Sequence, residues 1–197
     1  MTGTPVIDKV FADNLGTAFG GCVRDQCVSL FSREIPRAAG VDWNPLPFIG
    51  REAKTRFRAR WAALLQGIGL WVALTEIPEL AAEDKLSRKI SSQLQAYTDA
   101  VLKAPLIDHL TADEVRDYNL LRQRFMRMAT ITSTPPSNDQ FARAFLSAVS
   151  GRTPSEIPGD RILKLSAQIT LAANLFRKLA RICRDDPQSY ERASKKN

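Results

Sequence analysis

The stretch from Trp61 to Leu74, WAALLQGIGLWVAL, contains a single polar side chain, that of Gln66. At about 100° per residue its large apolar side chains point in every direction around a helix, so such a helix has to be buried on every side. The run is shorter than the ~18 apolar residues typical of a membrane span, and three arginines between positions 56 and 60 directly precede it. It therefore predicts the central helix of a soluble helical domain, over residues 51–77, and no association with a membrane.

Apolar side chains at helical spacing also predict the other elements of the chain, and no alternating β-branched run predicts a strand. The fold class is therefore predicted to be all-α. The first of the remaining helices is expected from Thr4-Pro5 through Phe31, weakened at Gly16, Gly20 and Gly21. Two further helices are expected at 83–103 and 111–130. A short helix is expected to end at Gly151, and the last helix to run from an Asp160 cap to about residue 185. Together they predict a single domain, residues 1–186, built as a bundle of about five to six helices. Residues 187–197 are predicted to form a polar, flexible tail.

The last helix has the most regular pattern in the chain, a heptad seam in which apolar residues recur in steps of three and four. The seam consists of Ile162, Leu165, Ile169, Ala172, Phe176, Leu179 and Cys183. Leu171, Leu175 and Ile182 widen the apolar face to about half of the helix surface. This width predicts packing inside a bundle rather than a two-stranded coil.

Residues 35–50 contain Pro36, Pro45 and Pro47 and cannot form one regular element. The segment is nevertheless apolar, through Trp43, Leu46, Phe48 and Ile49. Such a loop either covers part of the core or docks a protein partner.

Metal and cofactor chemistry are not indicated. His109 is the only histidine, and the three cysteines, Cys22, Cys27 and Cys183, have no metal-binding spacing. An odd number of cysteines and no visible signal peptide predict free thiols in a reducing cytoplasm. Gly67 and Gly69 lie inside an apolar helical run, which favours close helix packing over a dinucleotide-binding turn.

Acid–base catalysis has one weak candidate pair, Asp113 and Asp117, which lie on one face of the 111–130 helix. Acidic residues near the start of a helix also interact favourably with the helix dipole, and this is the simpler interpretation. The chain is therefore predicted to be non-enzymatic, with a small helical enzyme as the weakest hypothesis.

Basic residues carry the strongest functional signal, because the formal net charge is +7 and arginines outnumber lysines. They fall on three predicted helices as Arg51, Lys54, Arg56, Arg58 and Arg60, as Arg124 and Arg127, and as Arg177, Lys178, Arg181 and Arg184. Three basic helix faces predict a groove that contacts a nucleic-acid phosphate backbone. A GC-rich genome would explain the arginine excess without any function.

The leading hypothesis is thus a non-enzymatic protein that binds DNA or RNA, alone or as an accessory subunit of a nucleoprotein complex. The alternative is a protein–protein interaction module, such as an adaptor, inhibitor or regulatory subunit. This module would use the 43–49 loop and the last helix, and an acidic protein would be its partner.

Overall fold

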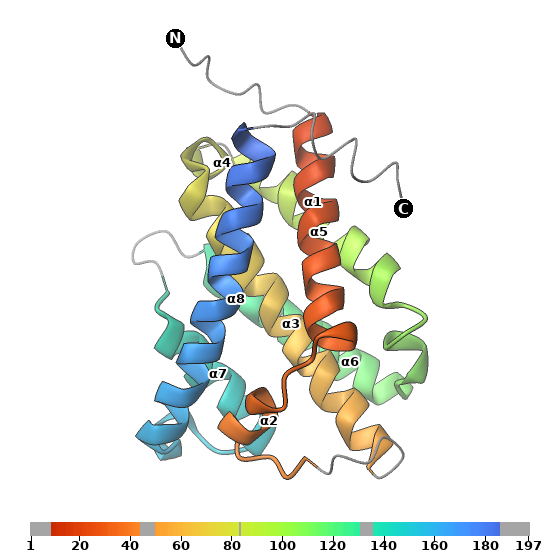
Figure 1. The fold of residues 1–197 in the computed structure, drawn as a ribbon, viewed down its shortest axis with the longest axis vertical. Coiled ribbons are helices and arrows are strands. Elements are labelled where there is room, and N and C mark those ends of the chain that lie inside the picture. The colour runs from red at the N-terminus through yellow and green to blue at the C-terminus, as the bar shows by residue number, and fades with distance from the viewer. Residues whose placement is uncertain (1–8, 44–49, 83, 131–135, 186–197) are drawn as a thin grey trace.

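The computed structural model describes residues 9–43, 50–82, 84–130 and 136–185, and its fold is all-α, as predicted (Figure 1). Within these residues there are eight α-helices and no strand. The helices are α1 (Lys9–Arg24), α2 (Glu34–Ala38), α3 (Arg51–Glu76), α4 (Pro78–Ala82), α5 (Asp84–Leu102), α6 (Ala112–Thr130), α7 (Asn138–Ser150) and α8 (Gly159–Asp185). A π-helical turn, Asp25–Ser29, follows α1, and 3-10 turns lie at Ile107–His109 and Pro154–Glu156. Residues 187–197, where the tail was predicted, lie outside the described part.

Helix α3 runs obliquely between α1 and α8 on one side and α6 on the other, and it also contacts α5 and α7 (Figure 1). Every residue from Trp61 to Leu70 is buried, whereas Trp71 and Leu74 are half-buried. The side-chain amide of Gln66 is satisfied in part: its Nε2 donates a hydrogen bond to the hydroxyl of Tyr118 at 2.8 Å, whereas its buried Oε1 has no partner among the described residues.

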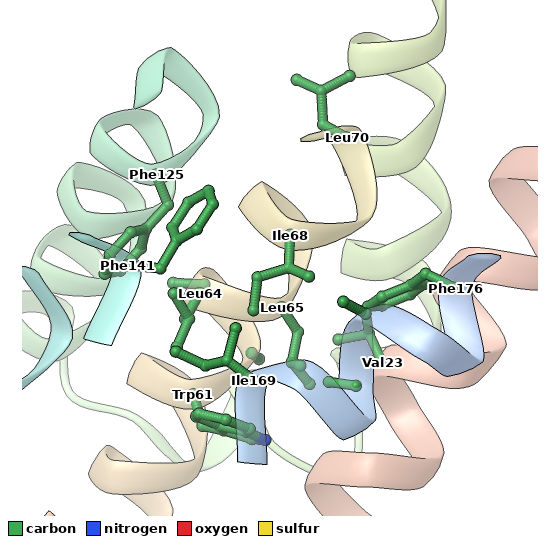
Figure 2. Close-up of a cluster of buried hydrophobic side chains, with 14 of the residues drawn as sticks. Val23, Trp61, Leu64, Leu65, Ile68, Leu70, Phe125, Phe141, Ile169 and Phe176 are labelled. Carbon is green, nitrogen blue, oxygen red and sulfur yellow. The ribbon is translucent and has the colours of Figure 1, made fainter. Parts of the chain in front are cut away.

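The core is a continuous cluster of apolar side chains around α3 (Figure 2). Leu64, Leu65 and Ile68 of α3 lie between two groups of side chains from the surrounding helices. Phe125 of α6 and Phe141 of α7 stand on one side, and Val23 and Phe176 stand on the other. Aromatic side chains dominate this packing, with the rings of Phe19 and Phe176 4.9 Å apart between α1 and α8.

Gly67 lies where α3 crosses α6. A Cβ atom at this position would stand 2.6 Å from Cβ of Phe125 and 2.9 Å from its backbone carbonyl carbon. The two helices approach so closely that no larger residue fits, which confirms the prediction of close packing at this glycine.

Several predicted helix ends are confirmed by their caps. Thr111 and Glu114 exchange hydrogen bonds between side chain and backbone before α6, at 3.3 and 2.9 Å. Gly151 ends α7 with a φ of 70°, a left-handed conformation that favours glycine. The cap of the last helix was predicted wrongly, because α8 already begins at Gly159 and Asp160 lies in its first turn. The short helices α2 and α4 were not predicted.

Helix α8 buries its heptad seam, except for half-buried Leu179, but not the wider face that the sequence predicted. Leu171, Leu175 and Ile182 are 60%, 48% and 39% exposed. The prediction of half-cylinder burial is therefore wrong, because α1, α2, α3 and α7 contact α8 and leave this edge uncovered by described residues.

Candidate anion-binding site

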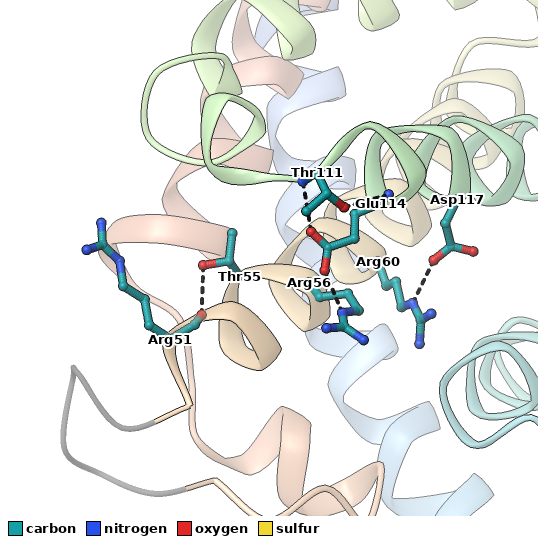
Figure 3. A network of polar contacts seen from close by, with 7 residues as sticks. All are labelled: Arg51, Thr55, Arg56, Arg60, Thr111, Glu114 and Asp117. Atoms are coloured by element: carbon teal, nitrogen blue, oxygen red, sulfur yellow. Dashed lines mark hydrogen bonds and ion pairs between the residues drawn. The ribbon is translucent and has the colours of Figure 1, made fainter.

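The basic residues of α3 divide between two faces of the helix. On the face toward α6, Arg56 Nε lies 2.8 Å from Glu114 Oε1 and Arg60 Nε lies 2.9 Å from Asp117 Oδ2 (Figure 3). A hydrogen bond from the backbone of Thr111, together with the nearby Arg56, lowers the pKa of Glu114 and keeps it ionised. These two arginines are therefore neutralised within the protein.

The other face of α3 carries Arg51, Lys54, Thr55 and Arg58, which fall within about 100° of one another at helical periodicity. Figure 3 shows Arg51 pointing away from the ion pairs on α6. This face lines a cavity of about 420 Å³, here called the basic cavity. Its other walls are Val28, Ser29, Phe31, Arg33, Trp43, Pro105 and His109. None of these described lining residues is an Asp or a Glu, so four formal positive charges face one space without a lining carboxylate.

Arg58 forms the inner wall of the basic cavity and is half-buried. Its guanidinium carbon lies 5.1 Å from the ring centroid of Phe31 and 5.8 Å from that of Trp43. Burial lowers the pKa of Arg58 and so disfavours its charged form, while the aromatic faces stabilise the cation. Its Nε is buried and has no hydrogen-bond partner among the described residues. The contacts that the described residues make with this guanidinium are therefore those of the two aromatic rings.

The start of α3 adds a further positive field. Gly50 precedes the helix with a φ of 64°, and no side chain among the described residues caps the first turn. The exposed amide groups and the helix dipole favour an anion here, partly offset by the exposed Glu52. Arg51 is the first residue of this turn and also lines the cavity.

The basic residues of α8 do not join the basic cavity. Arg177 Nε and Arg181 Nε lie 3.4 and 3.2 Å from the two carboxylate oxygens of Glu76. Arg184 Nη1 donates to the backbone carbonyl of Glu76 at 3.4 Å. Because Glu76 is 18 residues beyond Arg58 on α3, this cluster is about 27 Å from the cavity along the helix axis. Arg58 and the α8 arginines thus stand at opposite ends of α3 and are not brought into one compact groove.

The remaining predicted residues lie elsewhere. Arg124 and Arg127 are exposed on α6 outside the basic cavity, and Lys178 borders an apolar groove beside Leu175. Trp43 lies in the cavity wall, half-buried and 5.1 Å from the ring of Phe31. Leu46, Phe48 and Ile49, the rest of the predicted docking loop, lie outside the described residues.

The weaker chemical candidates are accounted for by local contacts. Asp117 pairs with Arg60, and Asp113 lies 3.3 Å from Arg116, so both carboxylates of the catalytic hypothesis have cationic partners. Burial raises the pKa of Cys27 and, to about 11, that of Cys183, which keeps both thiols protonated and unreactive.

Among the lining residues that were not predicted as site residues, two carry titratable side chains, Arg33 and His109. Both are exposed, and they come from the start of α2 and from the 3-10 turn before α6. No local sequence pattern joins them to α3, because only the packing of these elements brings them to one cavity.

Comparison of the chain with protein families, with curated proteins and with solved structures finds no match. In the part of the chain that the structure describes, no helix combines the length and apolar character needed to cross a membrane. Function is therefore inferred from the residues of the site.

Proposed function

We propose that this chain is a non-enzymatic nucleic-acid-binding protein that contacts phosphate groups through the basic cavity. One observation carries the proposal: four cationic side chains line a single cavity in which no described lining residue is acidic. In the same proposal, residues 51–77 form the centre of a single helical bundle that presents these cations. A cytoplasmic location agrees with the three free thiols.

Chemistry supports phosphate as the ligand group. Three of the four cations are arginines, whose planar forks donate paired hydrogen bonds to phosphate oxygens. Phe31 and Trp43 add aromatic surface, which is the usual companion of basic residues where single-stranded nucleic acid binds.

A salt titration tests this function. Binding of single- and double-stranded oligonucleotides is measured at several salt concentrations for the wild-type protein and for Arg51→Ala. We expect a linear fall of log K with log salt, and a slope reduced by about 0.7 to 0.9 in the variant, for the loss of one phosphate contact.

The matched control is Arg181→Ala. It also removes one positive charge, but from a side chain that pairs with Glu76 at the other end of α3. It should leave affinity and slope close to those of the wild type. Absence of binding at low salt, or an equal loss in both variants, contradicts the proposed function.

A second candidate function, a protein–protein interaction module, is favoured by the exposed edge of α8. Leu175, Ile182 and Leu179 line an apolar groove with Leu30, which is 74% exposed. Contiguous exposed apolar side chains of this kind are typical of protein contact surfaces. The groove also carries one charge of each sign, Lys178 and Asp25, with which a partner could pair.

A further inference from the structure

We infer that the basic cavity binds a nucleotide through its terminal phosphomonoester, as at the phosphorylated end of a single strand, rather than the internal phosphates of a backbone. This inference rests on the proposed function and specifies its ligand. Four steps lead to it.

The first step is size. A cavity of about 420 Å³ lies within the range of about 300–1,000 Å³ that small-molecule sites occupy. A single nucleotide fits such a space. A duplex, whose major groove alone is about 12 Å wide, does not enter it.

The second step is the lack of a cationic path that leads away from the cavity along α3. The next arginines on the helix, Arg56 and Arg60, are paired with Glu114 and Asp117 (Figure 3). At the C-terminal end of α3, Arg177 and Arg181 of α8 are both paired with Glu76. A strand that lay along this helix would meet neutralised charges, whereas the end of a strand meets concentrated charge.

The third step is charge. Arg33, Arg51, Lys54 and Arg58 supply four formal positive charges, and the uncapped start of α3 adds a partial one. An internal phosphodiester carries a single negative charge, but a terminal phosphomonoester carries about −1.5 to −2 at pH 7 and has three free oxygens. The monoester therefore matches the cavity better in charge and in the number of hydrogen bonds that it accepts.

The fourth step is the rest of the wall. Val28, Phe31, Trp43 and Pro105 offer apolar surface against which a base or sugar can pack. The hydroxyl of Thr55 donates to the backbone carbonyl of Arg51 at 2.9 Å, so its oxygen remains able to accept a hydrogen bond. A purely inorganic anion would leave this apolar surface unused.

The experiment compares single-stranded oligonucleotides of one sequence that carry a 5′-phosphate, a 3′-phosphate or hydroxyls at both ends. Affinity is measured for the wild type and for Arg33→Ala and Arg51→Ala, two exposed side chains whose loss leaves the core intact. We expect one phosphorylated strand to bind about tenfold more tightly than the hydroxyl strand, as charge-assisted hydrogen bonds to the additional charge would give. This preference should shrink in both variants and persist in Arg127→Ala, an exposed arginine on α6 outside the cavity.

The outcomes separate the inference from the function on which it rests. Equal, salt-dependent affinity for phosphorylated and hydroxyl strands overturns the inference and leaves nucleic-acid binding in place. No binding of any strand overturns both.

Nucleoside mono-, di- and triphosphates as competitors identify the source of the terminal phosphate. If they compete in the wild type with the affinity of a phosphorylated strand, the site is supported and its ligand is the free nucleotide. A phosphate preference that both cavity variants retain places binding elsewhere and overturns the inference.

Discussion

At the scale of single residues, Gly67 determines how closely α3 and α6 can approach. The nearest atoms to a Cβ at this position include backbone atoms of Phe125, which cannot rotate away. Gly21 on α1 offers a contrast, since a Cβ there would meet nothing within 4 Å. The same substitution should therefore have opposite effects at these two glycines.

Gly67→Ala is expected to lower the free energy of unfolding by about 1–3 kcal/mol, because the added methyl forces the two helices apart. Gly21→Ala should raise it by about 0.5–1 kcal/mol, since alanine favours the helix and space is available. Urea denaturation of both variants checks the pair. Equal effects of the two substitutions would contradict the close crossing at Gly67.

At the scale of elements, the C-terminal end of α3 is tied to α8 through Glu76. Its carboxylate meets Arg177 and Arg181, and Arg177 also lies 5.5 Å from the ring centroid of Trp71. The side chain of Arg181 is 60% exposed, so solvent screens its attraction to Glu76. The side chain of Arg177 is 31% exposed, so its attraction to Glu76 is screened less. The cluster thus serves helix packing first, although the sequence suggested a ligand surface.

Charge reversal of both residues, Arg177→Glu with Arg181→Glu, should therefore destabilise the protein, because three carboxylates would then face one another. We expect a loss of about 1 kcal/mol, or a fall in Tm of about 2–4 °C for a chain of this size. The control is Arg124→Glu with Arg127→Glu, the same charge change at exposed positions on α6. Thermal unfolding followed by circular dichroism should show the fall in the α8 variant alone, and equal Tm values would refute the packing role.

At the scale of the whole molecule, one apolar cluster joins residues of α1, α3, α5, α6, α7 and α8. Leu64 is fully buried there, whereas Leu163 on α8 is 68% exposed. Replacing each of these two leucines by aspartate therefore tests the effect of burial, because the residue removed and the residue introduced are the same at both positions.

Leu64→Asp should prevent folding, because an unpaired buried charge costs several kcal/mol against a total stability of about 5–15 kcal/mol. Leu163→Asp should fold with nearly unchanged stability. Near-ultraviolet circular dichroism and analytical gel filtration distinguish folded from unfolded variants. A folded Leu64→Asp protein would contradict the burial of α3.

The sequence predicted the long helices well, because periodicity and local caps determine them. The pattern from Arg51 to Ile77 placed α3 almost to the residue, and Thr111 with Glu114 marked the start of α6. Charge partners could not be predicted in the same way. Arg56 and Glu114 are 58 residues apart in sequence, and only the crossing of α3 and α6 brings them together. The same limit applies to the basic cavity, where Arg33 and His109 reach α3 through tertiary packing alone.

The absence of acids from the described lining of the basic cavity also has a consequence for the empty protein. The three arginines held around one space, Arg33, Arg51 and Arg58, repel one another, and burial of Arg58 adds a desolvation penalty that lowers its pKa. In the complex proposed above, a bound anion would relieve this repulsion, and the relief would supply part of the binding free energy. Residues that would stabilise the empty state, such as an acid in the cavity wall, would weaken binding by the same interaction. Stability and affinity are thus set against each other at this one place in the molecule.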